Sequence, residues 1–327
     1  MEGWTMKKIA RHIAALLFIL YVLPQGAMAV QLLVPGGQVV GLELGDGSIT
    51  VAAFDDALGS AARDAGLQVG DRILQVDGNP VSQPEDIRLA LERSEGSVEL
   101  RIQRLGKEKT LHLNPQITGD GPRLGVYLKR GVTGIGTVTF YDPATGRFGA
   151  LGHGVNDSSG NLLHLTDGSA YRAAVSSVKK GKSGAPGQLH GSVLGELPVG
   201  TLDINSAQGV FGTAETGFSG EAIPVAAFEQ IRTGEAEIYS TVSGDGLQEY
   251  SVEILKIYPE DRADGRNLLL RVTDPDLLET TGGIVQGMSG SPIIQDGKLV
   301  GAVTHVLVNQ PDTGYGIFIE NMLDAAS

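Results

Sequence analysis

Residues 287–292 read Gly-Met-Ser-Gly-Ser-Pro, and they lead into two apolar segments joined at Gln295-Asp296-Gly297-Lys298. A nucleophilic serine needs an exposed hydroxyl on a tight turn, with free backbone N–H groups nearby to receive an oxyanion. Glycines on both sides of Ser289 permit such a turn and let a second backbone come close. The pattern makes Ser289 the candidate nucleophile, although a Gly-x-Ser-Gly-x-Pro segment alone is equally compatible with an ordinary β-turn.

The segment resembles the Gly-Asp-Ser-Gly-Gly-Pro loop of trypsin-like peptidases, which is also followed by a hairpin that lines the substrate pocket. The resemblance implies an oxyanion hole made by the backbone N–H groups of Gly287 and Ser289. The nucleophile elbow of α/β-hydrolases requires Gly-x-Ser-x-Gly, but position 291 is a serine. A hydrolase of that class is therefore disfavoured.

A general base is the second requirement, and His153 is the favoured histidine. It lies between two glycines at the end of the apolar segment 148–152. Imidazole titrates near neutrality and can carry a proton from the serine to the leaving group. His153 precedes Ser289 by 136 residues, in the chain order of the chymotrypsin class. His305 follows Ser289 on the next apolar segment, where a position in the pocket lining or the core is expected.

The acid that would orient the imidazole is less clearly marked. Asp274 lies 15 residues before Ser289, and Asp157 and Asp203 are alternatives. In trypsin-like enzymes the acid lies farther from the serine, so spacing alone does not select Asp274. The alternative interpretation is that Asp274 caps a turn before Pro275.

Composition sets limits on the partners and the fold. Among 327 residues there are 47 glycines and no cysteine, and the net charge is −13. Disulfides and thiolate catalysis are excluded, and nucleic acid is an improbable partner because the chain has no basic cluster. From Gln116 onward, short apolar segments alternate with turn residues, which indicates a β-barrel or sandwich.

The segment before residue 115 has a different pattern. Residues 60–78 indicate a short helical turn followed by a strand that ends at Asp77-Gly78, and a helix is expected over 83–93. "AARDAGLQVGDRILQVDGNPV" resembles the bacterial PDZ signature. The resemblance implies peptide binding by β-augmentation, with the carboxylate-binding loop at Val40, Gly41 and Leu42. The alternative is a β-rich spacer.

The N-terminal segment has the pattern of a targeting sequence. Lys7, Lys8 and Arg11 form a basic flank before an apolar run of eleven residues, 13–23, and Ala27-Met28-Ala29 offers a cleavage site. The run is too short to span a bilayer comfortably, so a signal peptide is predicted over residues 1–29, with a retained membrane anchor as the alternative.

Taken together, these motifs resemble the stage IV sporulation protein B peptidase family. The resemblance is carried by residues 134–157, "GIGTVTFYDPATGRFGALGHGVND", by residues 282–323 around Ser289, and by the preceding PDZ unit. It implies catalysis by His153, Asp274 and Ser289, without a metal or cofactor. It also implies export from the forespore into the intermembrane space, and cleavage there of the inhibitory partner of a membrane-embedded metalloprotease, which releases processing of pro-sigma-K.

The expected architecture is mainly β, with a PDZ domain over 30–115 and a trypsin-like double β-barrel peptidase over 116–327. The expected partners are a protein substrate, a peptide ligand of the PDZ domain and, at least transiently, a membrane. The rival hypothesis is a non-catalytic PDZ adaptor whose second domain is a degenerate peptidase.

Overall fold

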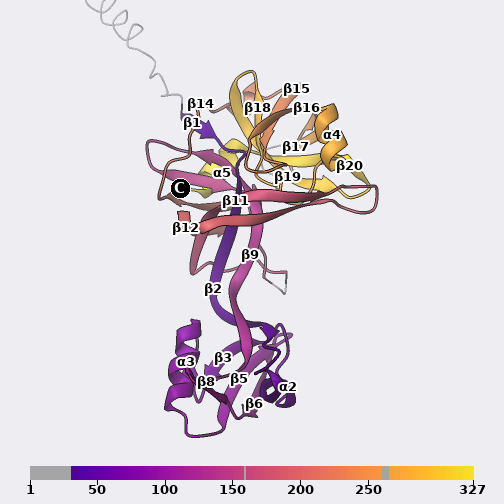
Figure 1. Ribbon diagram of the computed structural model, residues 1–327. Coiled ribbons are helices and arrows are strands. Elements are labelled where there is room, and N and C mark those ends of the chain that lie inside the picture. Colours follow the sequence, from indigo (N-terminus) through magenta and orange to yellow (C-terminus); the bar gives the residue numbers. More distant parts are fainter. Residues whose placement is uncertain (1–30, 158–159, 259–264) are drawn as a thin grey trace, which may run out of the picture. The chain divides into compact units, whose positions relative to one another are not determined.

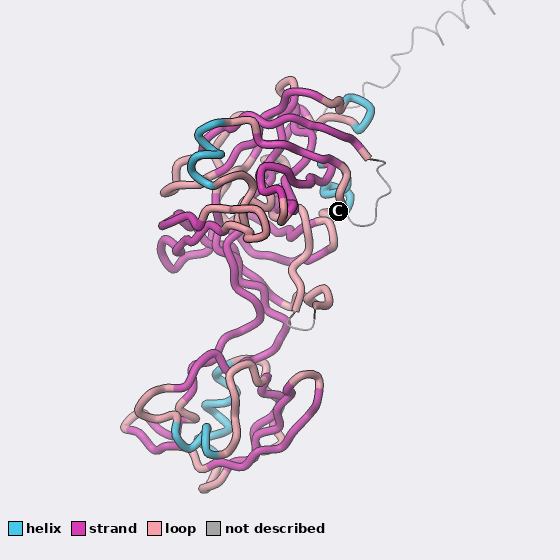
Figure 2. Tube along the Cα trace, turned by 90° about the vertical axis from the view of Figure 1, so that its right-hand side faces the viewer, coloured by secondary structure: helices cyan, strands magenta, loops and turns pink. Residues whose placement is uncertain are grey.

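The computed structural model describes residues 31–157, 160–258 and 265–327, and the predicted leader over 1–29 lies outside them. Strands dominate this part of the chain (Figure 2). None of the helices in the described ranges is long and apolar enough to cross a bilayer.

Six strands form the first barrel. Their pairing runs β2-β9-β10-β13-β12-β11 and returns to β2, because β2 pairs with both β9 and β11. Side chains of alternating residues, Val40, Leu42 and Leu44, point into this barrel's core with Val138 and Phe148. The strands are β2 (Val39–Phe54), β9 (Val126–Tyr141), β10 (Arg147–Ala150), β11 (Asp167–Lys179), β12 (Gln188–Ser206) and β13 (Gly209–Ala214).

A second closed barrel follows in the order β15-β16-β17-β20-β19-β18. Val39, Ala173 and Leu189 of the first barrel belong to the same apolar cluster as the interior of the second, so the two barrels share a core. The predicted double β-barrel is confirmed. Its strands are β15 (Gly234–Ser240), β16 (Gln248–Ile257), β17 (Leu268–Val272), β18 (Pro292–Gln295), β19 (Lys298–Leu307) and β20 (Gln310–Phe318).

Short elements complete the peptidase part. The strand β1 pairs with β14 and β9, and the helix α4 leads into the loop that contains Ser289. These elements are β1 (Leu32–Pro35), β14 (Ile223–Pro224), a 3-10 turn (Phe228–Gln230), α4 (Pro275–Thr281) and α5 (Ile319–Ala325).

A separate core belongs to the domain predicted to be a PDZ domain. Ile49, Val51, Ile73, Ile87 and Leu100 are buried in it. Its elements are α2 (Ser60–Asp64), β3 (Arg72–Val76), β4 (Asn79–Pro80), α3 (Pro84–Arg93), β5 (Val98–Arg104) and β6 (Lys107–Leu113), and the small β7 (Gln116–Thr118) and β8 (Gly121–Arg123) pair with each other.

The strands β2 and β9 each contribute to two cores. They lie side by side and pair from Val39↔Thr137 to Phe54↔Val126, with a shift of register between Leu44 and Ile49 (Figure 1). Consequently the predicted domain limits at 30 and 115 do not coincide with the cores: residues 39–44 belong to the barrel, and residues 124–128 pack against the PDZ core. The turn residues near Asn114-Pro115 indicated a domain boundary there. The strands β2 and β9, however, run from one core into the other, and no turn residues mark the place where they do so.

One buried ion pair ties the PDZ core together. Asp71 is 1% exposed and accepts hydrogen bonds from the Gln68 amide at 2.8 Å and from Nε and Nη2 of Arg104, each at 2.6 Å. Arg104 also donates to the carbonyl of Gly66 at 2.7 Å. The pair therefore fastens the turn after α2 to β5.

We expect Arg104→Met to destabilise this domain by about 3–5 kcal/mol, because it leaves the Asp71 carboxylate buried without its partner. Denaturant unfolding measures the loss. Arg101→Met is the matched control, since Arg101 pairs with Glu108 at the surface and should cost less than about 1 kcal/mol. Equal losses in the two variants would contradict the structural role of the buried pair.

Candidate active site

The loop that contains Ser289 is held by β9 of the other barrel. The Thr137 hydroxyl donates to the carbonyl of Gly287 at 2.7 Å, and the Thr137 amide donates to the carbonyl of Ser289 at 3.1 Å. The Thr139 hydroxyl donates to the carbonyl of Gly290 at 2.8 Å. Both threonines are fully buried, so three successive anchors fix the path of the loop from Gly287 to Gly290.

Two further hydrogen bonds decide where the amides of Gly287 and Ser289 point. In a trans peptide the C=O and N–H groups point in opposite directions. The carbonyl of Gln286 accepts from the Leu189 amide at 2.8 Å, and that of Met288 accepts from the Ser291 amide at 2.9 Å. The N–H groups of Gly287 and Ser289 are therefore turned to the opposite side.

Neither of these two amides donates a hydrogen bond to any described residue. Two free N–H groups beside a serine hydroxyl are what an oxyanion requires. The amides of Gly287 and Ser289 are thus available for the oxyanion role that the resemblance to trypsin-like peptidases implies, and that role stays a prediction.

The glycines of the loop have backbone conformations that other residues avoid. Gly287 has φ +100° and Gly290 has φ +98°. A Cβ at Gly290 would collide with the carbonyl oxygen of Thr137. The glycine pattern around Ser289 therefore follows from the tight turn and from its close contact with β9.

His153 follows β10 on a turn in which Leu151 and Gly152 both have positive φ, +71° and +69°. Its Nδ1 lies 2.9 Å from the carbonyl oxygen of Gly154. A carbonyl can only accept, so Nδ1 carries the proton of the neutral ring and Nε2 is left as the proton acceptor. Burial lowers the pKa of His153, and the hydrogen bond to Gly154 opposes part of that shift.

The loop after His153 is fastened by the half-buried side-chain amide of Asn205. Asn205 accepts from the Val155 amide at 2.9 Å and donates to the carbonyls of Val155 and Leu163, each at 2.8 Å. Asn205 thus fixes the backbone two residues beyond the base. It was not recognised from the sequence, where nothing distinguishes it from other polar residues near a turn.

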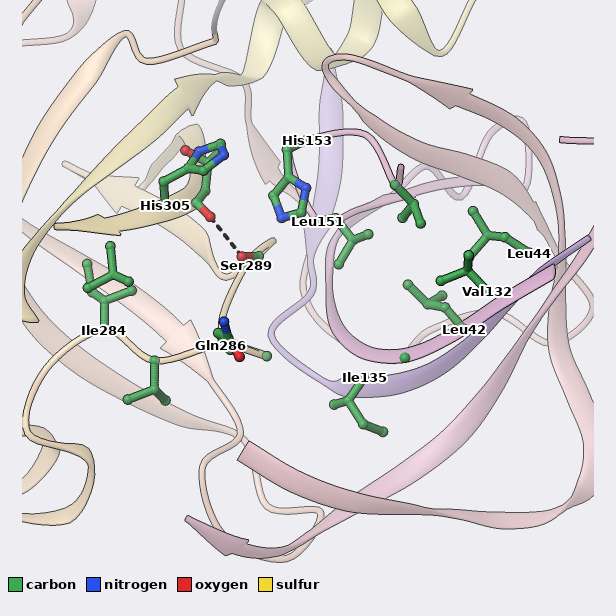
Figure 3. A pocket seen from close by; sticks show the side chains of 16 residues that line it. Leu42, Leu44, Val132, Ile135, Leu151, His153, Ile284, Gln286, Ser289 and His305 are labelled. Carbon is green, nitrogen blue, oxygen red and sulfur yellow. Dashed lines mark hydrogen bonds between the residues drawn. The ribbon is translucent and has the colours of Figure 1, made fainter. Parts of the chain in front are cut away.

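A pocket of about 420 Å³ brings Ser289, His153 and His305 together (Figure 3). The Ser289 hydroxyl donates to the carbonyl of Thr304 at 2.8 Å, and the centroids of the two imidazole rings are 5.2 Å apart. Figure 3 shows Leu42, Leu44, Val132 and Ile135 on one side of Ser289 and Ile284 and Gln286 on the other. His305 lines the pocket, one of its two expected positions.

The predicted acid does not join them. Asp274 is the N-cap of α4, where one carboxylate oxygen accepts from the Leu277 amide at 2.9 Å and the other from Ser251 at 3.4 Å. Of the alternatives, Asp157 accepts from the Asn161 amide, and Asp203 pairs with Arg147. Within the described residues, no carboxylate lines the pocket.

The prediction that Val40, Gly41 and Leu42 form the carboxylate-binding loop of the PDZ domain is wrong. Val40, Gly41 and Leu42 lie inside β2, which pairs with β9 on one edge and with β11 on the other. Val40 and Leu42 are buried in the first barrel. A strand paired on both edges has no free amides to offer a carboxylate.

The structure places a suitable loop at Leu124 and Gly125. Neither amide donates to a described residue, and Gly125 has φ +71°, where a Cβ would collide with the carbonyl of Leu58. The loop opens a groove of about 470 Å³ between α3 and the start of β9, lined by Ile87, Leu91 and Val126 among others. The feature of the sequence that could have indicated this loop is the glycine just before a strand, in Arg-Leu-Gly-Val at 123–126.

Comparison with known proteins identifies both parts. The family model described as SpoIVB peptidase S55 matches residues 121–323. The chain belongs to the SpoIVB peptidase S55 family. A PDZ family model matches residues 57–104.

Individual relatives are more distant. A putative zinc metalloprotease, R01501, of Rhizobium meliloti is 30% identical over 165 residues, and the match covers 44% of each chain, so this chain spans less than half of that relative. The Rv3671c protease of M. tuberculosis in its active form is 15% identical with a TM-score of 0.35, covering 59% of this chain and 73% of that chain. The PDZ domain of an SdrC-like protein from Listeria monocytogenes is 21% identical with a TM-score of 0.22, covering 24% and 85%.

We expect the acidic limb of kcat/KM to have its midpoint below pH 6.5. The base acts in its neutral form, and burial lowers the pKa of His153 below its ordinary value of 6.5, so activity should persist at pH values where a solvent-exposed histidine is already protonated. A pH profile of peptide hydrolysis measures the limb. The variant His305→Gln should leave the midpoint in place, and a midpoint above 6.5 would contradict the assignment.

Proposed function

We propose that this protein is a serine peptidase, which cleaves peptide bonds with Ser289 as the nucleophile and His153 as the general base. The observation that supports it is the pair of amides of Gly287 and Ser289, which donate to no described residue and point away from the engaged carbonyls of Gln286 and Met288. Such preorganised donors act without further rearrangement when negative charge develops on the substrate carbonyl oxygen.

The reaction follows from these positions. The Ser289 hydroxyl turns from the Thr304 carbonyl to Nε2 of His153, passes its proton there, and its oxygen bonds to the substrate carbonyl carbon. The two amides hold the resulting oxyanion. His153 then gives the proton to the leaving nitrogen as the C–N bond breaks, and water, activated by the same imidazole, releases the acyl group.

We expect a fluorophosphonate probe to label the wild-type chain and His153→Ala far more slowly, and not to label Ser289→Ala at all, since the probe reacts with an activated serine. Loss of the nucleophile should lower peptide hydrolysis by about 10⁶. The matched control is Ser291→Ala, because the Ser291 hydroxyl is buried against that of Ser240 at 3.0 Å. Labelling that persists in Ser289→Ala and disappears in Ser291→Ala would reverse the assignment, and no labelling of the wild type would favour the non-catalytic adaptor.

The family resemblance assigns the acid to Asp274, which caps α4 in the structure. Asp274→Asn separates the role of a triad acid from that of a helix cap. Because Asn caps a helix about as well as Asp, we expect thermal stability to be unchanged. If the carboxylate acts on the imidazole, turnover should fall by roughly 10⁴. Turnover within about tenfold of wild type would restrict Asp274 to the cap.

We also propose that the peptidase acts outside the cytoplasm, in sporulation signalling, on the inhibitory partner of a membrane-embedded metalloprotease. Family membership and the sequence pattern of residues 1–29 support this. Purified partner should be cut by wild type and left intact by Ser289→Ala. A fusion of residues 1–29 to alkaline phosphatase that remains inactive in cells would argue against export.

For the PDZ groove we propose binding of a peptide C-terminus at the Leu124 and Gly125 amides. The full-length Ser289→Ala chain should bind a peptide that ends in a free carboxylate and an apolar residue at least about tenfold more tightly than the same peptide with a C-terminal amide, because the amide removes the charge that the two donors hold. Fluorescence anisotropy measures both. Equal affinities would exclude capture of a carboxylate at this loop.

A further inference from the structure

The strand β9 has a free edge that starts at the nucleophile. The amide of Thr137 donates to Ser289 and its carbonyl accepts from Leu151, whereas the Val138 amide donates to Gln38 on the β2 side. Successive residues of a strand turn their backbone groups to opposite edges. Thr133 and Ile135 therefore present their N–H and C=O groups on the same edge as Thr137, facing away from β2.

No strand covers this edge beside Thr133 and Ile135 in the part of the chain that the structure describes. Pairing of β10 with β9 begins at Val138, and β2 occupies the opposite edge along this length. An unpaired edge is a template for an added strand. Val132, Gly134 and Ile135 from this stretch line the catalytic pocket, so the edge borders the pocket that contains Ser289.

A second hollow, here called the outer pocket, borders the same stretch of β9 through Thr133, Gly134 and Ile135. It measures about 340 Å³ and shares Leu42, Gly134 and Ile135 with the catalytic pocket. Tyr171 and Val193 supply its apolar surface, and Val193 is 46% exposed. The remaining lining residues are Gly41, Glu43, Thr133, Gly191 and Gly195.

Gly41 lets Val193 reach this position. A Cβ at Gly41 would lie 2.6 Å from Cγ2 of Val193. The glycine in β2 is therefore explained by the outer pocket, after its predicted role in the PDZ domain proved wrong.

The chemistry indicates which half of a substrate lies here. The acyl half must lie against the oxyanion amides of Gly287 and Ser289, which belong to the second barrel. The leaving nitrogen must face His153, which the first barrel carries, because it takes its proton from that ring. The chain that follows the scissile bond is thus directed toward the first barrel, where the free edge of β9 is found.

We infer that the edge of β9 at Thr133 and Ile135 binds the substrate segment after the scissile bond as an added β-strand, with one apolar side chain in the outer pocket. The inference rests on the proposed function and extends it to specificity. The preferred substrate is an extended segment with an apolar residue shortly after the cleaved bond, and Glu43 disfavours an acidic residue at that position.

Gly134 allows a direct test. An added Cβ would meet no atom within 4 Å, and the φ of Gly134 is not in the left-handed region, so Gly134→Leu should fold while its side chain takes up space at a position that lines both pockets. Gly246→Leu is the matched control, because Gly246 has the same freedom and lines neither pocket. The substrate is a peptide mixture from a digested proteome, in which the new N-termini report the residues after each cleaved bond.

We expect wild type and Gly246→Leu to favour Leu, Ile, Val or Phe at one of the first positions after the bond. Gly134→Leu should lose this preference and cut the mixture roughly tenfold or more slowly, the usual loss for an apolar contact. Because Gly134 also lines the catalytic pocket, labelling by a fluorophosphonate, which has no leaving segment, should fall somewhat, but much less than cleavage of the mixture. Labelling that falls as much as peptide cleavage would overturn the inference, whereas no labelling of wild type would instead overturn the proposed function.

A second variant tests the outer pocket without touching the edge. Val193→Asp places a carboxylate beside Glu43 on a half-exposed position, and it should shift the preference from apolar residues to Lys or Arg at the same substrate position. An unchanged preference would show that the outer pocket does not contact the substrate.

Discussion

The hydrogen bonds from two buried threonines to the Ser289 loop are the constraint on which the active site depends. Thr137 and Thr139 belong to one barrel, and the carbonyls that they bind belong to a loop of the other. A hydroxyl buried at an apolar position costs free energy unless it is bonded, so each threonine favours the one arrangement in which the loop supplies its acceptor. Within the loop held in this way, the amides of Gly287 and Ser289 are oriented because the carbonyls of Gln286 and Met288 are engaged by the amides of Leu189 and Ser291.

The strand β9 contributes to three parts of the molecule along its length. Its first residues form a wall of the PDZ groove, its middle borders the catalytic pocket, and the two threonines anchor the nucleophile loop. These positions are set by one pleated backbone, so none can shift in register without moving the others. The constraint also explains why the pocket is made by both barrels, since the base and the nucleophile come from different ones.

Local sequence was sufficient to single out Ser289, His153 and Gly287, which the structure brings to one pocket, because a serine and a histidine that each stand between glycines are visible in consecutive residues. The double barrel followed from the strand density together with the resemblance to trypsin-like loops. Val40, Gly41 and Leu42 were misassigned because a short apolar-glycine-apolar segment occurs in many contexts, and only strand pairing over long separations shows that both edges are occupied. Asp274 was misplaced for the same reason: the neighbouring residues can show that it starts a helix, but they cannot show how far it lies from the imidazole. Asn205 could not be found because its hydrogen-bond partners are 42 and 50 residues away in the sequence.

The pairing of Leu44 with Val132 has a consequence for the history of the chain. Since these residues face each other across the ladder, everything between them leaves and re-enters the barrel at one point. The PDZ domain is therefore an insertion into what would otherwise be a simple β-hairpin, and a short turn from residue 44 to residue 132 would close the barrel without it. The peptidase barrel cannot finish folding until the PDZ domain has been synthesised, because the two strands of the hairpin are separated by about ninety residues of chain.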